Sequence, residues 1–203
     1  MNFATYQDFR VALQTLIDGD DLLSEIAPET LDLIIGLGEV RVYRDLRAST
    51  METALAQVVT ANAAPLPANC LALGIVWFDP TKLLEIVSES DLRSRMTALS
   101  GGTPRKCAQA GETVIFSPTA ANAATLAGRY YARPVDLKTA LNTTFARYPE
   151  LFLYASLCES APFLGEQERL PVWETTLARL MGSAMSQENN RVFSGSQLRQ
   201  VAR

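Results

Sequence analysis

The 203-residue sequence contains no histidine. Histidine is the commonest general base and metal ligand in proteins, so its absence excludes Ser-His-Asp and Cys-His catalysis and makes a metal site unexpected. The three cysteines, Cys70, Cys107 and Cys158, are odd in number and lie far apart. They indicate neither a disulfide framework nor a zinc site, and each is expected to be a small buried apolar residue. We therefore expect no cofactor and no bound metal.

The sequence also lacks any apolar run near the roughly 20 residues that span a bilayer. Its start has no basic region before an apolar one, so we expect a cytosolic product without a signal peptide and no membrane partner. The net charge of −4 offers no general attraction to nucleic acid or to an anionic membrane. With 48% hydrophobic residues, the chain can bury the core of one domain, or of one domain with an insertion.

The clearest helical pattern runs from Pro28 to Arg47. Apolar residues recur there at steps of three and four, which places them on one stripe that should face a core. This stripe consists of Leu31, Ile34, Ile35, Gly38, Val42 and Leu46. The other face carries the charged residues Asp32, Glu39, Arg41, Arg44 and Asp45. A solvated helix face explains these charges simply, but the density of arginine at the helix end also suits fixed ion pairs between subunits.

Other segments divide by their periodicity. Thr5 and Asp8 resemble a capping pair and begin a first helix of about a dozen residues, by the usual helix length. After Arg47, short segments rich in β-branched or aromatic residues alternate with turn residues and predict strands. The expected strands are 53–60, 70–78, 82–87, 113–116 and 126–131, with a short helix at 88–96. From Pro149 onward the helical period returns in two helices, the first stopped by Pro162 and Gly165.

These elements predict an α+β fold. Neither helix pair can bury its apolar stripe alone, so the N- and C-terminal pairs should form a four-helix bundle from which a central β-rich insertion projects. The expected boundaries are 1–50 and 141–190 for the bundle helices, 51–140 for the insertion and 191–203 for an extended C-terminal tail. From Asn189 onward the sequence has three arginines and no acidic residue, which is typical of a flexible basic arm.

Six stretches resemble the head-to-tail adaptor proteins of short-tailed bacteriophages, also called tail tubular protein A or connector proteins. They follow the order of that family's pattern and cover most of the chain. In one-letter code they are EVRVYRDLR (39–47), LPANCL (66–71), SGGTPRK (100–106), GETVIFSP (111–118), RYYARP (129–134) and YPELFLYASL (148–157). The chain departs from the pattern at Asn69, where an aspartate is typical, and in having few aromatic residues around Lys106.

The resemblance implies a structural virion protein that forms a ring, of twelve subunits, beneath the portal of the DNA-filled head. Its implied partners are the portal protein, the tail nozzle protein, further copies of itself, and genome DNA that passes through the lumen without sequence-specific binding. Assembly would take place in the host cytoplasm. The isolated chain is expected to be monomeric until the portal templates the ring, because its exposed faces read as charged rather than apolar.

Two sets of residues are hypotheses for this assembly role. The first is a subunit interface on the helix that ends at Arg47, and comprises Glu39, Arg41, Arg44, Asp45 and Arg47. The second is a portal-docking tail, and comprises Arg191, Phe193, Leu198, Arg199 and Arg203. Arginine suits the first because its planar group binds carboxylates with fixed geometry.

Two other functions remain open from the residues alone. A tail-associated glycan hydrolase could use a carboxylate pair without histidine. The nearest cluster for it is Glu159, Glu166, Glu168 and Glu174. A DNA-binding or DNA-packaging factor would instead use the arginines of the tail, Arg191, Arg199 and Arg203.

Overall fold

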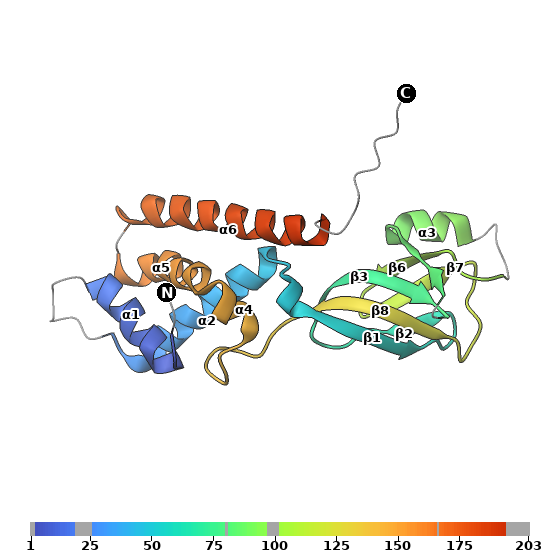
Figure 1. The fold of residues 1–203 in the computed structure, drawn as a ribbon, viewed down its shortest axis with the longest axis horizontal. Helices are drawn as coiled ribbons and strands as arrows, with labels where there is room; N and C mark the ends of the chain where they lie inside the picture. The colour runs from blue at the N-terminus through green and yellow to red at the C-terminus, as the bar shows by residue number, and fades with distance from the viewer. Residues whose placement is uncertain (1–2, 19–25, 80, 97–101, 166, 194–203) are drawn as a thin grey trace, which may run out of the picture. The chain divides into compact units, whose positions relative to one another are not determined.

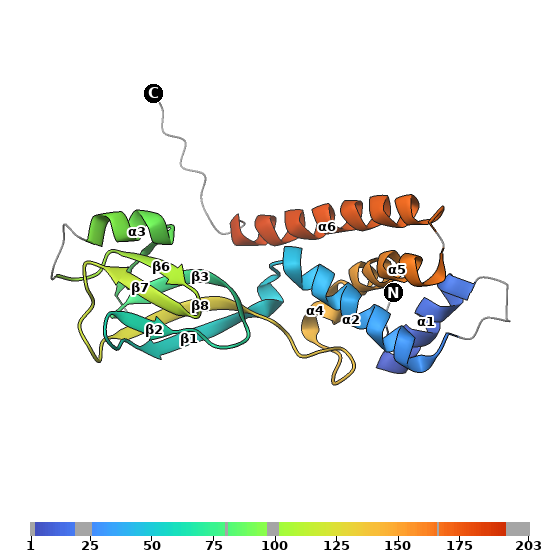
Figure 2. The same cartoon turned by 180° about the vertical axis from the view of Figure 1, so that it is seen from behind.

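The structure is a computed structural model that describes residues 3–18, 26–79, 81–96, 102–165 and 167–193. The chain divides into two compact units (Figures 1 and 2). The helical unit takes residues 1–50 and 134–203, and the β unit takes residues 51–133. The expected α+β class is confirmed, with helices and two sheets in the described residues.

The helical unit is built around one central helix. Its elements are α1 (Tyr6–Asp18), α2 (Pro28–Asp45), α4 (Thr143–Arg147), α5 (Pro149–Leu164) and α6 (Leu170–Phe193). Helix α5 contacts α1, α2, α4 and α6. Apolar residues therefore occur nearly all around α5, whereas its neighbours bury one stripe each.

Local sequence signals fix the ends of these helices. Before α1, the Thr5 and Asp8 side chains each accept the other's backbone N–H, at 3.1 and 2.8 Å, which confirms the capping pair. Asn142 caps α4 by accepting the N–H of Phe145 at 2.9 Å. Helix α5 ends at Gly165, whose φ of 73° is left-handed, and Pro162 lies inside the last turn rather than stopping the helix.

Gly38 brings α2 and α5 into close contact. A Cβ built at Gly38 would lie 2.6 Å from Oγ of Ser156 and 2.8 Å from its backbone nitrogen. Such distances are shorter than any ordinary contact, so only glycine permits this approach. The neighbouring core contains edge-to-face aromatic pairs, among them Tyr43 with Phe152 at 5.5 Å between ring centroids.

The β unit contains two four-stranded sheets. The first has the order β1 (Glu52–Val58), β8 (Thr125–Ala132), β3 (Cys70–Phe78), β4 (Lys82–Leu83). The second has the order β2 (Ala63–Pro65), β7 (Thr113–Ser117), β6 (Lys106–Ala110), β5 (Glu85–Ile86). The short helix α3 (Glu89–Met96) contacts β6 and β7, and the 3-10 turn η1 (Ser49–Met51) precedes β1. The β unit has one buried hydrophobic core, which includes Val76, Phe78, Phe116, Leu126 and Tyr130.

The observed boundaries differ from the expected ones in three places. The β unit ends at Arg133, and residues 134–142 group with the helical unit instead of the insertion. The strand expected at 82–87 is two short strands that belong to different sheets. Helix α6 continues through Phe193, so the first residues of the expected tail are helical, and residues 194–203 lie outside the described part of the chain.

Candidate functional site

Arg41 joins three helices of the helical unit. From α2, its Nη1 lies 3.1 Å from Oε1 of Glu159 on α5, and its Nη2 binds a carboxylate oxygen of Glu174 on α6. Burial works against the charge of Arg41, but the bonds and charges of Glu174 and Glu159 outweigh it and raise the pKa of the guanidinium. Arg41 is thus an internal clamp between α2, α5 and α6.

Glu39 is buried, so its expected place on an exposed helix face is wrong. Glu39 is 3% exposed, and its Oε1 accepts the backbone N–H of Leu137 at 2.7 Å. Residues 134–142 return from the β unit along this side of α2 without regular secondary structure, and their backbone donors need partners. Glu39 supplies one, and Asn142 adds a second link by donating to the Tyr43 hydroxyl at 2.7 Å.

The other three residues of the expected interface fall into two groups. Arg47 is partly buried, and its Nη1 donates to the carbonyl oxygens of Tyr43 at 2.7 Å and Leu46 at 2.9 Å. It therefore caps the C-terminal end of its own helix. Arg44 and Asp45 are both exposed in the described chain. These two remain available to a neighbouring molecule.

The solvent side of α2 carries apolar residues that were not predicted to be exposed. Leu33, Leu37 and Val40 are 53%, 37% and 40% exposed. Their spacing of four and three places them on one line of the helix, opposite the stripe that packs on α5. The sequence contains this signal as a second apolar stripe, so the exposed side of α2 is apolar in its middle and charged only toward its ends.

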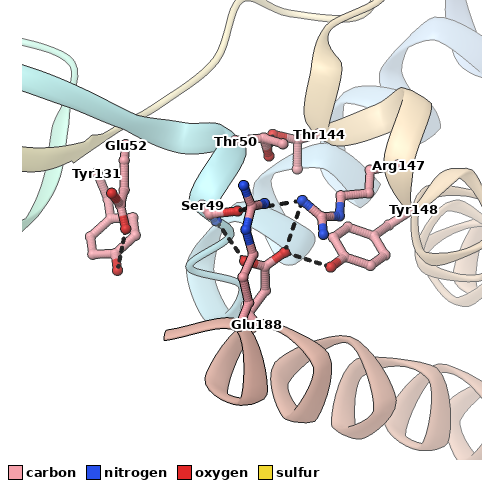
Figure 3. A network of polar contacts seen from close by, with 9 residues as sticks. Ser49, Thr50, Glu52, Tyr131, Thr144, Arg147, Tyr148 and Glu188 are labelled. Atoms are coloured by element: carbon pink, nitrogen blue, oxygen red, sulfur yellow. Dashed lines mark hydrogen bonds and ion pairs between the residues drawn. The ribbon is translucent and has the colours of Figure 1, made fainter. Parts of the chain in front are cut away.

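A polar network fixes the end of α6 to the segment that leaves α2 (Figure 3). Glu188 of α6 is 6% exposed and accepts the Ser49 backbone N–H at 2.9 Å and the Tyr148 hydroxyl at 2.6 Å. Nη1 of Arg147 lies 3.5 Å from the same carboxylate, and Nη1 of Arg191 donates to Oγ of Ser49 at 2.7 Å. Beside them, the hydroxyls of Thr50 and Thr144 lie 2.8 Å apart.

The network keeps Glu188 charged. Burial alone would raise the pKa of Glu188, but hydrogen bonds from Tyr148 and Ser49 and the charge of Arg147 hold it below the ordinary value. Burial and the hydrogen bond to Glu188 raise the pKa of Tyr148 to about 12, so its hydroxyl stays a donor at neutral pH. The network links the end of α6, the segment after α2 and the segment before α5, so its role is structural.

The expected docking tail is only partly described. Arg191 lies in the last turn of α6 and donates a hydrogen bond to the Ser49 hydroxyl. Phe193 is the last residue of α6. Leu198, Arg199 and Arg203 lie outside the described residues. The tail hypothesis therefore stays a prediction.

The carboxylates considered for hydrolysis do not form an open pair. Glu159 and Glu174 both bind Arg41, so each already has an ion-pair partner within the chain and neither faces an open substrate position as a catalytic pair would. Glu168 is exposed beside the turn between α5 and α6, and Glu166 lies outside the described residues. The arrangement does not favour glycan cleavage.

The cysteines and acidic groups give no metal or nucleophile site within the described ranges. No cluster of three or more potential ligands occurs there. Burial raises the pKa of Cys107 to about 12 and, as the main cause, that of Cys158 to about 11. Cys107 and Cys158 are buried as expected, whereas Cys70 is only partly buried, so the expectation of a buried residue is wrong there. No helix in the described part of the chain is long and apolar enough to cross a membrane.

A family model described as SU10 adaptor protein matches residues 4–200, which includes both units of the fold. No curated protein matches the chain.

Proposed function

The chain belongs to the SU10 adaptor protein family of phage head-to-tail adaptors, and on this basis we propose that it forms a ring joining the portal to the tail nozzle. The family is structural and its members are virion components. We further propose that α1, α2, α5 and α6 act as one four-helix bundle and form the body of each subunit. The match along residues 4–200 is the observation that carries the proposal.

The organisation of the chain supports an adaptor. Subunits in a closed ring meet through two different surfaces, so each needs a rigid body that holds those surfaces at a fixed angle. In the helical unit, the Arg41 clamp and the Glu188 network tie α6 to α2 and α5. These contacts would give the ring subunit such a body.

The proposed subunit interface includes fewer of the charged residues of α2 than the sequence predicted. Glu39, Arg41 and Arg47 all have partners within their own chain. Arg44 and Asp45 are exposed and neighbouring, and they carry opposite charges that a next subunit could complement. We therefore assign the charged part of the interface to these two residues.

The charge of the chain supports a conduit for DNA. The helical unit holds 16 acidic and 11 basic residues, whereas the β unit holds 6 and 7. A basic lumen would hold the duplex through many phosphate contacts, and an acidic one would let it slide during ejection. The proposed lumen therefore lies on the helical unit.

The segment after α6 is the proposed arm toward the portal. Residues 194–203 contain Arg199 and Arg203 and no acidic residue. An arm that orders on binding spends its conformational entropy only at assembly, which suits a step that must wait for the portal. The opposite end of the adaptor would receive the nozzle.

Sedimentation with purified portal rings tests the proposal. We expect the chain to run as a monomer alone, by native mass spectrometry, and to co-sediment with the portal as a ring of adaptors. A chain that ends at Phe193 should keep its thermal stability and lose portal binding. Failure to co-sediment, together with tails that still attach to heads after deletion of the gene, would overturn the adaptor function.

A further inference from the structure

The outer face of α2 consists of Glu29, Leu33, Leu37, Val40 and Arg44. All five are exposed, and their positions lie opposite the buried stripe that packs on α5. The middle of this face is apolar, with a carboxylate at one end and a guanidinium at the other. A helix face open to water normally carries charged residues throughout, so this face is suited to a protein contact.

The outer face of α6 has the complementary character. It consists of Thr175, Arg179, Gly182, Ser186 and Asn189, all exposed. These residues lie opposite the buried line of Trp173, Leu177 and Ala184. Most of them have small side chains, and Arg179 is the one charged residue in the set. The face is therefore shallow, and apolar side chains of another helix could enter it.

Two glycines on these helices have no role inside the fold. A Cβ at Gly36, beside Leu33 and Leu37, would meet nothing within 4 Å, and the same holds at Gly182. Gly38 differs, because Ser156 leaves no room there for a Cβ. Glycine in a helix interior lowers stability relative to alanine. Gly36 and Gly182 therefore weaken their helices, and no close contact within the chain requires a glycine at either position.

We propose that the outer face of α2 in one copy packs on the outer face of α6 in the next copy. This inference rests on the proposed ring and identifies the two surfaces that form it. The surfaces differ, so the contact is heterologous and can close by rotation. Leu33, Leu37 and Val40 form the ridge, and the small residues around Gly182 form the groove. Glu29 at one end of the α2 face has the charge opposite to that of Arg179 on the α6 face, while Arg44 lies at the other end of the α2 face.

A second copy fits this face better than any other occupant because both halves of the contact belong to one rigid unit. The two faces point away from α5 and cannot meet within a single copy. Standard interfaces use about 20–30 residues on each side, and each of these faces offers about five. The contact is therefore too small to hold a pair of free subunits, and it gains strength where the portal holds neighbours side by side.

Cysteine cross-linking tests the contact in portal-bound rings. In a Cys70→Ser background, Leu37→Cys and Gly182→Cys are combined in one chain and treated with a short bismaleimide. We expect a ladder of cross-linked oligomers that ends at the closed ring. The matched control combines Gly182→Cys with Val11→Cys, which is 53% exposed on α1 and outside both faces. It should give no ladder.

Mixed single variants distinguish the geometry. A tagged L37C chain should cross-link to an untagged G182C chain and not to a second L37C chain. Cross-linking of L37C to itself would show a two-fold contact and overturn the proposal. Rings that assemble on the portal without any link between positions 37 and 182 would also overturn it, while leaving the adaptor function intact. If no ring forms on the portal, both the α2–α6 contact and the adaptor function are overturned.

Alanine at the two glycines gives an independent test. Gly36→Ala and Gly182→Ala should each raise the melting temperature of the isolated chain by about 2 °C, because the sites have open space. The same variants should lower ring yield on the portal several-fold. A higher melting temperature with unchanged ring yield would contradict the contact. The contact would also be contradicted if the segment after Phe193 covered the outer face of α2 in its own copy. In that case a thiol reagent would label L37C faster in a chain that ends at Phe193 than in the full chain.

Discussion

Replacing Glu188 by glutamine should weaken the joint between the end of α6 and the segment that leaves α2. Its carboxylate oxygens accept from Ser49 and Tyr148 and face Arg147, with 7% of the side chain exposed. Glutamine keeps the shape but replaces one acceptor by a donor, so one of those N–H or O–H groups loses its partner. The variant tests whether the negative charge holds this joint together.

The size of the effect follows from the bonds lost. A hydrogen bond to a charged group contributes about 1.5–3 kcal/mol, so Glu188→Gln should lower the free energy of unfolding by about 2 kcal/mol. Glu188→Ala should cost about 3 kcal/mol, since both hydrogen bonds to the carboxylate are lost and the exposed Arg147 loses an ion-pair partner. Tyr148→Phe should cost about 1.5 kcal/mol, and its effect should be smaller when Glu188 is already glutamine.

The effect should depend on pH with a defined sign. The pKa of Glu188 is lowered in the folded chain, so its stabilisation is present above the unfolded-state pKa of about 4.3 and is lost as pH falls through the folded value. The stabilities of wild type and Glu188→Gln should therefore converge as the pH falls below about 4. The pKa of Tyr148 is raised to about 12, so its contribution is lost only as pH rises from about 10 through that value.

Urea unfolding at pH 7 and at pH 3.5 measures these differences, and amide hydrogen exchange at Ser49 reports the joint itself. Glu168→Gln is the matched control, because Glu168 is exposed and its loss should change stability little. Equal effects of the two substitutions at pH 7 would refute the reasoning. So would a stability gap for Glu188→Gln that persists unchanged at pH 3.5.

Two further substitutions test the packing of the helical unit. Gly38→Ala should lower the free energy of unfolding by about 1–3 kcal/mol in urea titrations, because its Cβ would overlap Ser156; a neutral result would contradict the close approach of α2 and α5. Arg41→Met should cost about 1–2 kcal/mol, and Arg41→Lys should recover only part of it because one ammonium cannot replace a planar fork between two carboxylates. Full recovery by lysine in thermal unfolding would argue against the fork.

The helices were predictable because their signals are local. The spacing of apolar residues and the prolines at the first turns located α2 and α5, and the Thr5 and Asp8 pair located the start of α1. The strands were harder. Lys106–Ala110 forms β6 without a β-branched or aromatic residue, since its place in the sheet comes from pairing with β7.

The candidate site was less predictable because it depends on which chain segments meet. Helical spacing put Glu39 beside charged neighbours, but residues 134–142 cover that side of α2 and bury it. The Glu188 joint requires the return of α6 to Ser49, which is 139 positions away in sequence. Leu33, Leu37 and Val40 also recur at helical spacing, but spacing alone does not tell which of two apolar stripes on α2 faces the core.

The division of the helical unit between the two ends of the chain has a consequence for its synthesis on the ribosome. The β unit is one continuous segment with its own core, so it can fold as soon as residue 133 has emerged. Helix α2, by contrast, must wait for α5, and the joint at Ser49 must wait for the end of α6. Helix α5 ends at Leu164, 119 residues after α2 ends at Asp45. At about 5–20 residues per second, this delay is about 6–24 s, during which both apolar stripes of α2 are exposed. During this interval the buried stripe of α2 has no α5 to pack against, so α2 is a segment in which early aggregation could begin.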